Sequence, residues 1–147
     1  MADEQGVIDP APAGTATEVD FAARLAGEFF VRGVEIVARA HGGDLLRSII
    51  FTAIAVANGE AAPAAGGGRR PVSVMSIAHS IGVPYETTRR YVNLLVADGL
   101  CVREGRRGVL IPDHALVSPA MNVAYRESLA SFNRLAVALK RINYSPA

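Results

Sequence analysis

The chain has 147 residues, half of them apolar and a fifth charged, with a formal net charge of +1. This composition is typical of one globular domain and is too apolar for a disordered chain. The longest apolar run, 49–57, is much shorter than the roughly 20 residues of a membrane-spanning helix, and the opening MADEQGVIDP lacks the features of a signal peptide. We therefore expect a cytoplasmic protein with no membrane partner.

The charge is distributed unevenly along the chain. Between residues 69 and 107 there are seven arginines and three acidic residues, which leaves a local excess of four positive charges. The remainder of the chain has an excess of three negative charges. A basic segment in an otherwise acidic chain indicates a local contact with a polyanion, and a merely solvated surface is the alternative.

Few residues suggest a metal or catalytic centre. The single cysteine, Cys101, cannot form a disulfide within the chain, and we interpret it as a structural residue rather than a redox switch. The three histidines, His41, His79 and His114, have no acidic or cysteine partners at ligand spacing. We expect no metal, no cofactor and no enzymatic activity; an enzyme built on the helices is the less favoured alternative.

The first part of the chain predicts a tail, two helices and a linker. Residues 1–16 lack periodicity and are expected to be a disordered tail. A helix is predicted from about 18 to 41, within an N-terminal dimerisation segment, 17–43. An aspartate N-cap then precedes a second helix, 45–58, which is apolar almost all round and therefore expected in the core. The Gly-rich stretch 59–71 predicts a flexible linker.

We expect the segment 44–112 to be one small domain. Beyond the linker, helices are predicted at 74–81 and 85–97, separated by the sequence GVP. Two short strands, 100–103 and 108–111, are joined by EGRR and predict a β-hairpin. The predicted fold is therefore mainly α with a small β-hairpin.

A final helix is predicted from Pro119 to about 142, within a C-terminal segment 113–147. Apolar residues recur along it at steps of three and four: Met121, Tyr125, Leu129, Phe132, Leu135 or Ala136, Leu139 and Ile142. Such a stripe needs a partner surface, which we expect to be the first helix and a second copy of the chain. The aromatic residues of the two long helices are expected to pack in a core, and a pocket for a small-molecule effector is the alternative.

The helix 85–97 divides into an inward and an outward face. Val83, Thr88, Tyr91, Val92 and Leu95 are expected inside. The residues left outside at its N-terminal half, and in the turn before it, are Pro84, Tyr85, Glu86, Thr87, Arg89, Arg90 and Asn93. Arginine can bridge the O6 and N7 atoms of guanine, and asparagine can pair with adenine in a similar fork. This face is the candidate DNA-reading surface.

The predicted hairpin carries three more arginines. Arg106 and Arg107 are expected at its tip and Arg103 at its base. Long cationic side chains on a thin β-ribbon can reach phosphates or a flanking minor groove. We therefore add these three residues to the candidate DNA-binding site.

The stretch MSIAHSIGVPYETTRRYVNLLVADGLCVREGRRGVLI resembles the winged helix-turn-helix domains of bacterial transcription regulators of the MarR, GntR and IclR kind. Thr87, Arg89 and Arg90 match the recognition-helix positions, and Asp98-Gly99-Leu100 matches the junction between helix and wing. The flanking long helices resemble MarR proteins in layout, although those usually have two C-terminal helices where one is predicted here. The resemblance implies a winged helix-turn-helix flanked by long N- and C-terminal dimerisation helices.

We therefore expect a sequence-specific, homodimeric transcription regulator that binds double-stranded DNA. The helix 85–97 would enter the major groove, and the wing, 103–108, would contact the flanking backbone or minor groove. An effector is possible but nothing in the sequence identifies it. The alternative is a winged-helix protein-interaction module that binds no DNA, which the small net charge of the chain allows.

Overall fold

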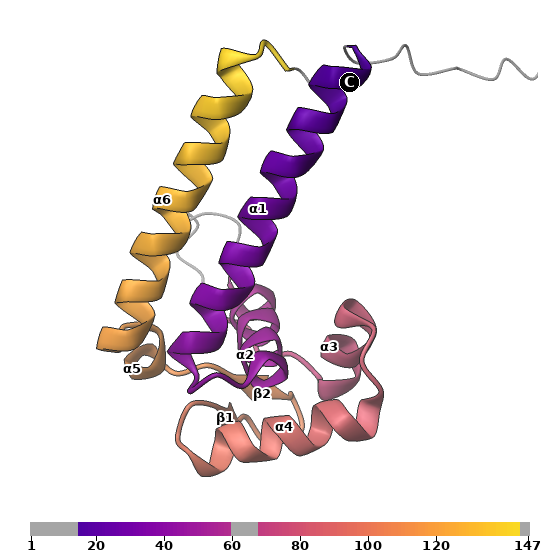
Figure 1. Cartoon of the computed structure of the whole chain (residues 1–147). Coiled ribbons are helices and arrows are strands. Elements are labelled where there is room, and N and C mark those ends of the chain that lie inside the picture. Colours follow the sequence, from indigo (N-terminus) through magenta and orange to yellow (C-terminus); the bar gives the residue numbers. More distant parts are fainter. Residues whose placement is uncertain (1–14, 60–67, 145–147) are drawn as a thin grey trace, which may run out of the picture. The chain divides into compact units, whose positions relative to one another are not determined.

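A computed structural model describes residues 15–59 and 68–144 (Figure 1). In chain order its elements are α1 (Ala16–Ala40), α2 (Leu45–Asn58), α3 (Val74–Ile81), α4 (Tyr85–Ala97), β1 (Val102–Arg103), β2 (Val109–Leu110), α5 (Asp113–Leu116) and α6 (Pro119–Arg141). The prediction of a mainly helical chain with one small hairpin is confirmed. Most of the predicted tail and linker, namely 1–14 and 60–67, lies outside the described residues.

The chain forms two compact units, which are described separately. One unit is Val34–Ser128, and the other combines the chain up to Gly33 with the chain from Leu129 onward. The helices α1 and α6 each contribute to both units. The candidate site residues all belong to the first unit.

Local signals in the sequence explain where the helices of the larger unit begin and end. The Asp44 carboxylate accepts a hydrogen bond from the Arg47 backbone N–H at 3.0 Å and caps α2. The Ser73 hydroxyl caps α3 in the same way, through the Ser76 N–H at 3.0 Å. Gly82 ends α3 in a left-handed conformation, with a φ of 65°, and allows the turn into α4.

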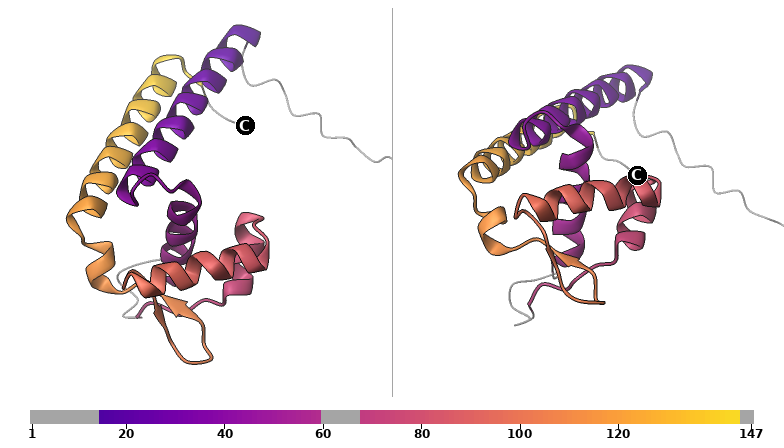
Figure 2. Two further views of the ribbon diagram at one scale, coloured as in Figure 1. Left: turned by 60° about the horizontal axis from the view of Figure 1, so that its bottom comes forward. Right: turned by 90° about the horizontal axis from the view of Figure 1, so that it is seen from below.

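The core of the larger unit forms around α2, which packs against α3, α4 and β2. In Figure 2, α4 crosses α2 and the hairpin follows the end of α4. The buried residues of this core are Ile50, Phe51, Ile54, Ile77, Val92, Leu95, Cys101, Val109, Ile111, Ala115 and Met121. The prediction that α2 lies in the core is confirmed, because it supplies three of these side chains, all of which are fully buried.

A third short β-segment, upstream of the hairpin, pairs with its second strand. Val102 pairs with Leu110 and Arg103 with Val109, while Val72 forms an isolated antiparallel bridge to Val109. Gly108 makes this close approach possible, because a Cβ atom there would lie 2.2 Å from the Val72 carbonyl oxygen and its φ is +122°. The strands are shorter than predicted because regular pairing is confined to these positions.

A buried asparagine ties the end of α2 to the hairpin. The Asn58 amide nitrogen donates to the Arg70 carbonyl oxygen at 2.7 Å and to the Val109 carbonyl oxygen at 3.0 Å. Its amide oxygen accepts from the Ile111 N–H at 2.9 Å, and its side chain is fully buried. Asn58 therefore contributes hydrogen bonds to backbone groups of two separate segments inside the protein.

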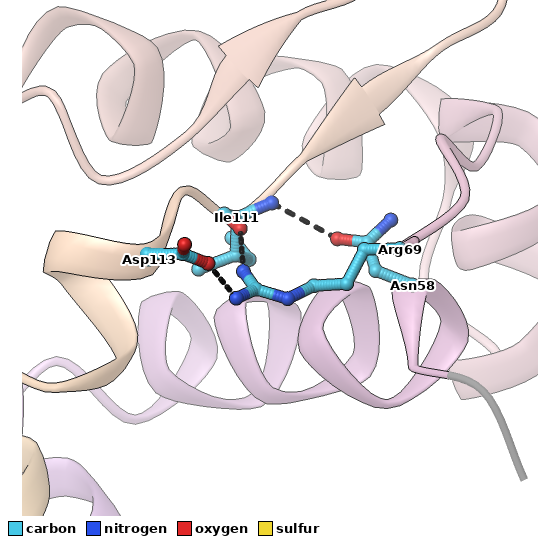
Figure 3. A network of polar contacts seen from close by, with 4 residues as sticks. All are labelled: Asn58, Arg69, Ile111 and Asp113. Atoms are coloured by element: carbon cyan, nitrogen blue, oxygen red, sulfur yellow. Dashed lines mark hydrogen bonds and ion pairs between the residues drawn. The ribbon is translucent and has the colours of Figure 1, made fainter. Parts of the chain in front are cut away.

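Arg69, like Asn58, makes a hydrogen bond to the backbone of Ile111. Its guanidinium donates to the Ile111 carbonyl oxygen at 2.6 Å, and it pairs with the Asp113 carboxylate at the start of α5 (Figure 3). The sequence placed Arg69 in the predicted flexible linker, 59–71. Arg69 is instead a half-buried connection between the chain before α3 and the chain after β2.

The smaller unit contains the first part of α1 and the second part of α6. The rings of Phe29 and Phe132 meet edge to face, with centroids 6.3 Å apart. Ala22 and Ser131 are buried, as small residues are where two helices approach closely. Several large apolar side chains remain exposed on this pair, namely Val19, Phe21, Phe30, Val31, Leu129, Phe132 and Val137.

Within the described ranges, no single helix has the length and apolar content needed to cross a membrane. The helices α1 and α2 reach those values only when counted together, and the chain bends sharply at the break between them.

Candidate nucleic-acid interface

The outward face of α4 is fixed by the residues on its inward side. Thr88, Val92 and Leu95 are fully buried, as predicted. The Thr88 hydroxyl donates to the Pro84 carbonyl oxygen at 3.1 Å, so the helix is anchored from its first turn. The predicted outward residues Pro84, Tyr85, Glu86, Arg89, Arg90 and Asn93 are all exposed, and Thr87 is half-buried.

Glu86 and Arg89 form an ion pair along the exposed face of α4. Both Nε and Nη2 of Arg89 donate to Oε2 of Glu86, at 3.1 and 2.7 Å. The Arg89 side chain is 51% exposed and the Glu86 side chain is 71% exposed, so water competes with each for hydrogen bonds. Hydrogen bonding to the Glu86 carboxylate raises the pKa of Arg89 above its ordinary value.

Arg90 lies beside an aromatic ring on the same helix. Its guanidinium carbon is 5.4 Å from the centroid of the Tyr91 ring, a distance at which a cation is attracted to the ring face. Tyr91 is half-buried, and Arg90 is exposed. The contact therefore supports the guanidinium without covering it.

The hairpin arginines occupy three different situations. Arg103 donates a hydrogen bond to the Asn93 amide oxygen and so links β1 to α4. Arg107 pairs with Glu104 at 3.0 Å inside the turn. Within 15–59 and 68–144, the Arg106 side chain has no hydrogen bond or ion pair. As predicted, Arg106 and Arg107 lie in the turn and Arg103 lies on the first strand.

The α4 face and the hairpin form one positively charged surface, because Arg103 joins them directly. Five arginines and two glutamates leave an excess of three positive charges among these residues. An open surface depression on α4 is lined by Glu86, Thr87, Arg89, Arg90, Asn93 and Leu94. An exposed cationic surface with a shallow hollow is suited to a large anionic partner.

Arg47 and His114 contact other parts of the same unit, whereas His79 does not form part of the proposed surface. Arg47, on α2, pairs with Asp98 at 2.5 Å, so the acidic residue that ends α4 is neutralised away from the outward face. The His114 ring lies 2.9 Å from the Gly99 carbonyl oxygen and braces the start of the hairpin. His79 is exposed on α3.

Cys101 lies inside the core, with only 1% of its surface exposed. Burial raises the pKa of its thiol above the ordinary value. A raised pKa keeps the sulfur in its unreactive thiol form, which agrees with the structural role expected from the sequence. The described part of the chain contains no group of His, Cys, Asp and Glu side chains that could hold a metal ion.

The chain was compared with protein-family models, curated proteins and solved structures, and none of them matches it.

Two features of the site were not apparent in the sequence. The first is which arginines contact Glu86 and Asn93, namely Arg89 and Arg103 rather than the i, i+4 partners Arg90 and Arg89. Glu86 lies three residues before Arg89, a spacing that favours pairs on a helix, so this contact had a local signal. The second is the support given by Asn58 and Arg69, whose contacts with Ile111 span 53 and 42 residues of the chain and had no such signal.

Proposed function

We propose that the chain is a winged helix-turn-helix transcription regulator that binds double-stranded DNA. In this reading α3 and α4 are the helix-turn-helix, and β1, β2 and their turn are the wing. The observation that carries the proposal is the hydrogen bond from Arg103 to Asn93, because it brings the wing and the outward face of α4 into one cationic surface. In this fold these two parts contact DNA together.

The order of elements supports the winged-helix assignment. The core helix α2 precedes α3 and α4, and the hairpin follows α4 at once. The Val72 bridge adds a third short β-segment beside the hairpin. The left-handed Gly82 supplies the tight turn that a helix-turn-helix requires.

The chemistry of the surface supports DNA as the partner. The outward residues of α4 would lie in the major groove, where Arg89 and Arg90 have donors for base edges and phosphates. Arg106 and Arg107, at the wing tip, would contact the flanking phosphates or minor groove. Such contacts release counterions, so affinity depends strongly on salt.

A fluorescence anisotropy titration of the full chain with duplex DNA of mixed sequence tests this function. We expect binding that weakens about tenfold or more between roughly 50 and 200 mM salt. The absence of binding at the lower salt concentration would contradict the proposal.

We also propose that the protein acts as a homodimer. The observation behind this is the row of exposed apolar side chains on the smaller unit, where Phe30, Val31 and Leu129 are 69, 67 and 65% exposed. A second copy would remove this surface from water and would present two reading helices to half-sites about one helical turn apart. Light scattering should give twice the chain mass, and Phe30→Glu should give monomers. A monomeric wild-type protein would contradict this part.

One observation favours a second function, a protein-interaction module. Leu94 is 47% exposed on α4 beside the reading residues, and apolar groups at the centre of a surface are more typical of protein partners. Two of the arginines on this surface, Arg89 and Arg107, are also paired with glutamates. The titration distinguishes the two functions, because a module of this kind would not bind mixed DNA.

A further inference from the structure

The acceptor groups of the reading surface already have partners within the protein. The Glu86 carboxylate is bound by Arg89, and the Asn93 amide oxygen is bound by Arg103. The donors that remain are one edge of the Arg89 guanidinium, the Arg90 guanidinium and the Asn93 amide nitrogen. The outward face of α4 therefore offers mainly hydrogen-bond donors, and its remaining side-chain acceptors are Oε1 of Glu86 and the hydroxyls of Tyr85 and Thr87.

The geometry of the Glu86–Arg89 pair decides which edge of the arginine is free. Glu86 occupies the side of the guanidinium defined by Nε and Nη2. The edge defined by Nη1 and Nη2 is left, and it has two parallel N–H donors. Two parallel donors match the adjacent N7 and O6 acceptors of guanine in the major groove.

The Arg103–Asn93 contact has the opposite effect on base reading. Asparagine recognises adenine with both groups of its amide, the oxygen accepting from N6 and the nitrogen donating to N7. Because Arg103 already donates to this oxygen and places a positive charge beside it, the adenine fork, in which the N6 amino group would share the oxygen, is disfavoured. The amide nitrogen alone can donate to any base that presents an acceptor, so it discriminates poorly.

Resting on the proposed function, we infer that Glu86 and Arg103 are positioning residues that make the reading surface selective for guanine. Glu86 holds Arg89 with its paired donors toward the DNA and does not itself contact a base. Arg103 donates to the Asn93 oxygen and disfavours the adenine fork. The ligand is therefore an operator half-site with one strongly specified guanine, at the position of Arg89, and a tolerant position opposite Asn93.

The charge of Glu86 provides a way to test this inference. A carboxylate next to DNA repels phosphates, so its removal alone should strengthen binding to every sequence. If it positions Arg89, removal should also weaken the preference for guanine. Glu104 is the matched control, because it is also a carboxylate paired with an arginine three residues away but lies in the wing. Glu86 is 71% exposed, so its removal leaves the core intact.

The experiment is a selection from a random duplex pool with the full-length wild-type protein, Glu86→Ala, Glu86→Gln and Glu104→Ala. We expect the wild type and Glu104→Ala to select the same guanine. Glu86→Ala should lose roughly tenfold of its preference for that base, and Glu86→Gln, which keeps an acceptor oxygen, should lose less. Arg103→Ala should gain a preference for adenine at a second position.

Each outcome supports or overturns a defined claim. If Glu86→Ala keeps the wild-type preference for guanine, Glu86 has no positioning role and the inference is wrong. If the wild type selects a motif without a specified guanine, the inference is wrong while the proposed function stands. If the wild type selects nothing and binds no DNA, the proposed function and the inference both fail.

Discussion

Two pairs of arginines in the larger unit differ in what surrounds them. Arg47 and Arg69 have side chains only 22% and 29% exposed, and each is paired with an aspartate far away in the sequence. Arg89 and Arg107 are 51% and 76% exposed, and each is paired with a glutamate three residues away. Arginine therefore has two roles in this unit. Burial together with a distant partner distinguishes Arg47 and Arg69 from Arg89 and Arg107.

The two groups have different physical consequences. A distant partner joins segments of the fold, so breaking the contact costs stability. A local pair on an exposed helix or turn contributes little to stability, because water and salt screen it. An arginine in an exposed pair of this kind keeps free N–H donors for a phosphate or a base edge, which is a property that a binding surface needs.

The largest expected effect comes from Asn58, at the centre of the distant connections. Asn58→Leu keeps the side-chain volume but leaves the Ile111 N–H and the Arg70 carbonyl oxygen without this partner. We expect a loss of about 3 kcal/mol in the free energy of unfolding, measured in urea. Asn133→Leu, the same change at an exposed position, should alter it by less than about 0.5 kcal/mol. Equal effects would show that the Asn58 contacts do not hold the hairpin.

A smaller effect is expected for the wing tip. Replacing Arg106 and Arg107 by alanine should lower the slope of log affinity against log salt by about one to two units, because two phosphate contacts are lost. Arg24→Ala with Arg32→Ala removes the same charge from exposed positions of α1 and should leave the slope unchanged. An unaltered slope in the wing variant would remove the wing from the proposed interface.

The smallest effect concerns pH. The His41 ring packs on Phe51, with centroids 4.6 Å apart, and burial together with the nearby charge of Arg47 lowers the pKa of His41 below its ordinary 6.5, although Asp44 partly opposes this. A lowered pKa means that the unfolded chain takes up a proton more readily. The resulting loss of stability begins as the pH falls through about 6.5 and continues down to the folded-state pKa.

The measurement is urea unfolding of the wild type and His41→Phe at about pH 7.5 and about pH 5.5. The carboxylates contribute equally to both proteins, so the difference between them reports His41. The wild type should therefore lose more stability on acidification than the variant. An identical loss in the two proteins would mean that His41 does not contribute.

Much of the fold was predictable because its signals are local. The helices α2, α3 and α4 have the predicted bounds, since Asp44, Ser73 and Gly82 mark them directly. The alternation of buried and exposed residues along α4 followed from helical periodicity in the same way. The short helix α5 was not predicted, because four residues contain no detectable period.

The supports of the site were not predictable, because they depend on partners distant in the sequence. Asn58 looked like the polar end of an apolar helix, and Arg69 looked like part of a linker. Nothing near either residue indicates that both meet the backbone of Ile111. Similarly, the interpretation of Cys101 as a structural residue gave no position for its side chain, which the structure buries in the core.

The measurement that tests this account most directly compares Arg69→Met with Arg89→Met in two assays on the same proteins. Methionine keeps much of the apolar stem and removes the cation in both cases. Arg69→Met should lower the free energy of unfolding by about 1–2 kcal/mol and leave the affinity of the folded protein for selected DNA unchanged. Arg89→Met should leave stability unchanged within error and weaken that affinity roughly tenfold to a hundredfold. If Arg89→Met binds the selected DNA as tightly as the wild type, the proposed DNA-reading role of α4 is contradicted.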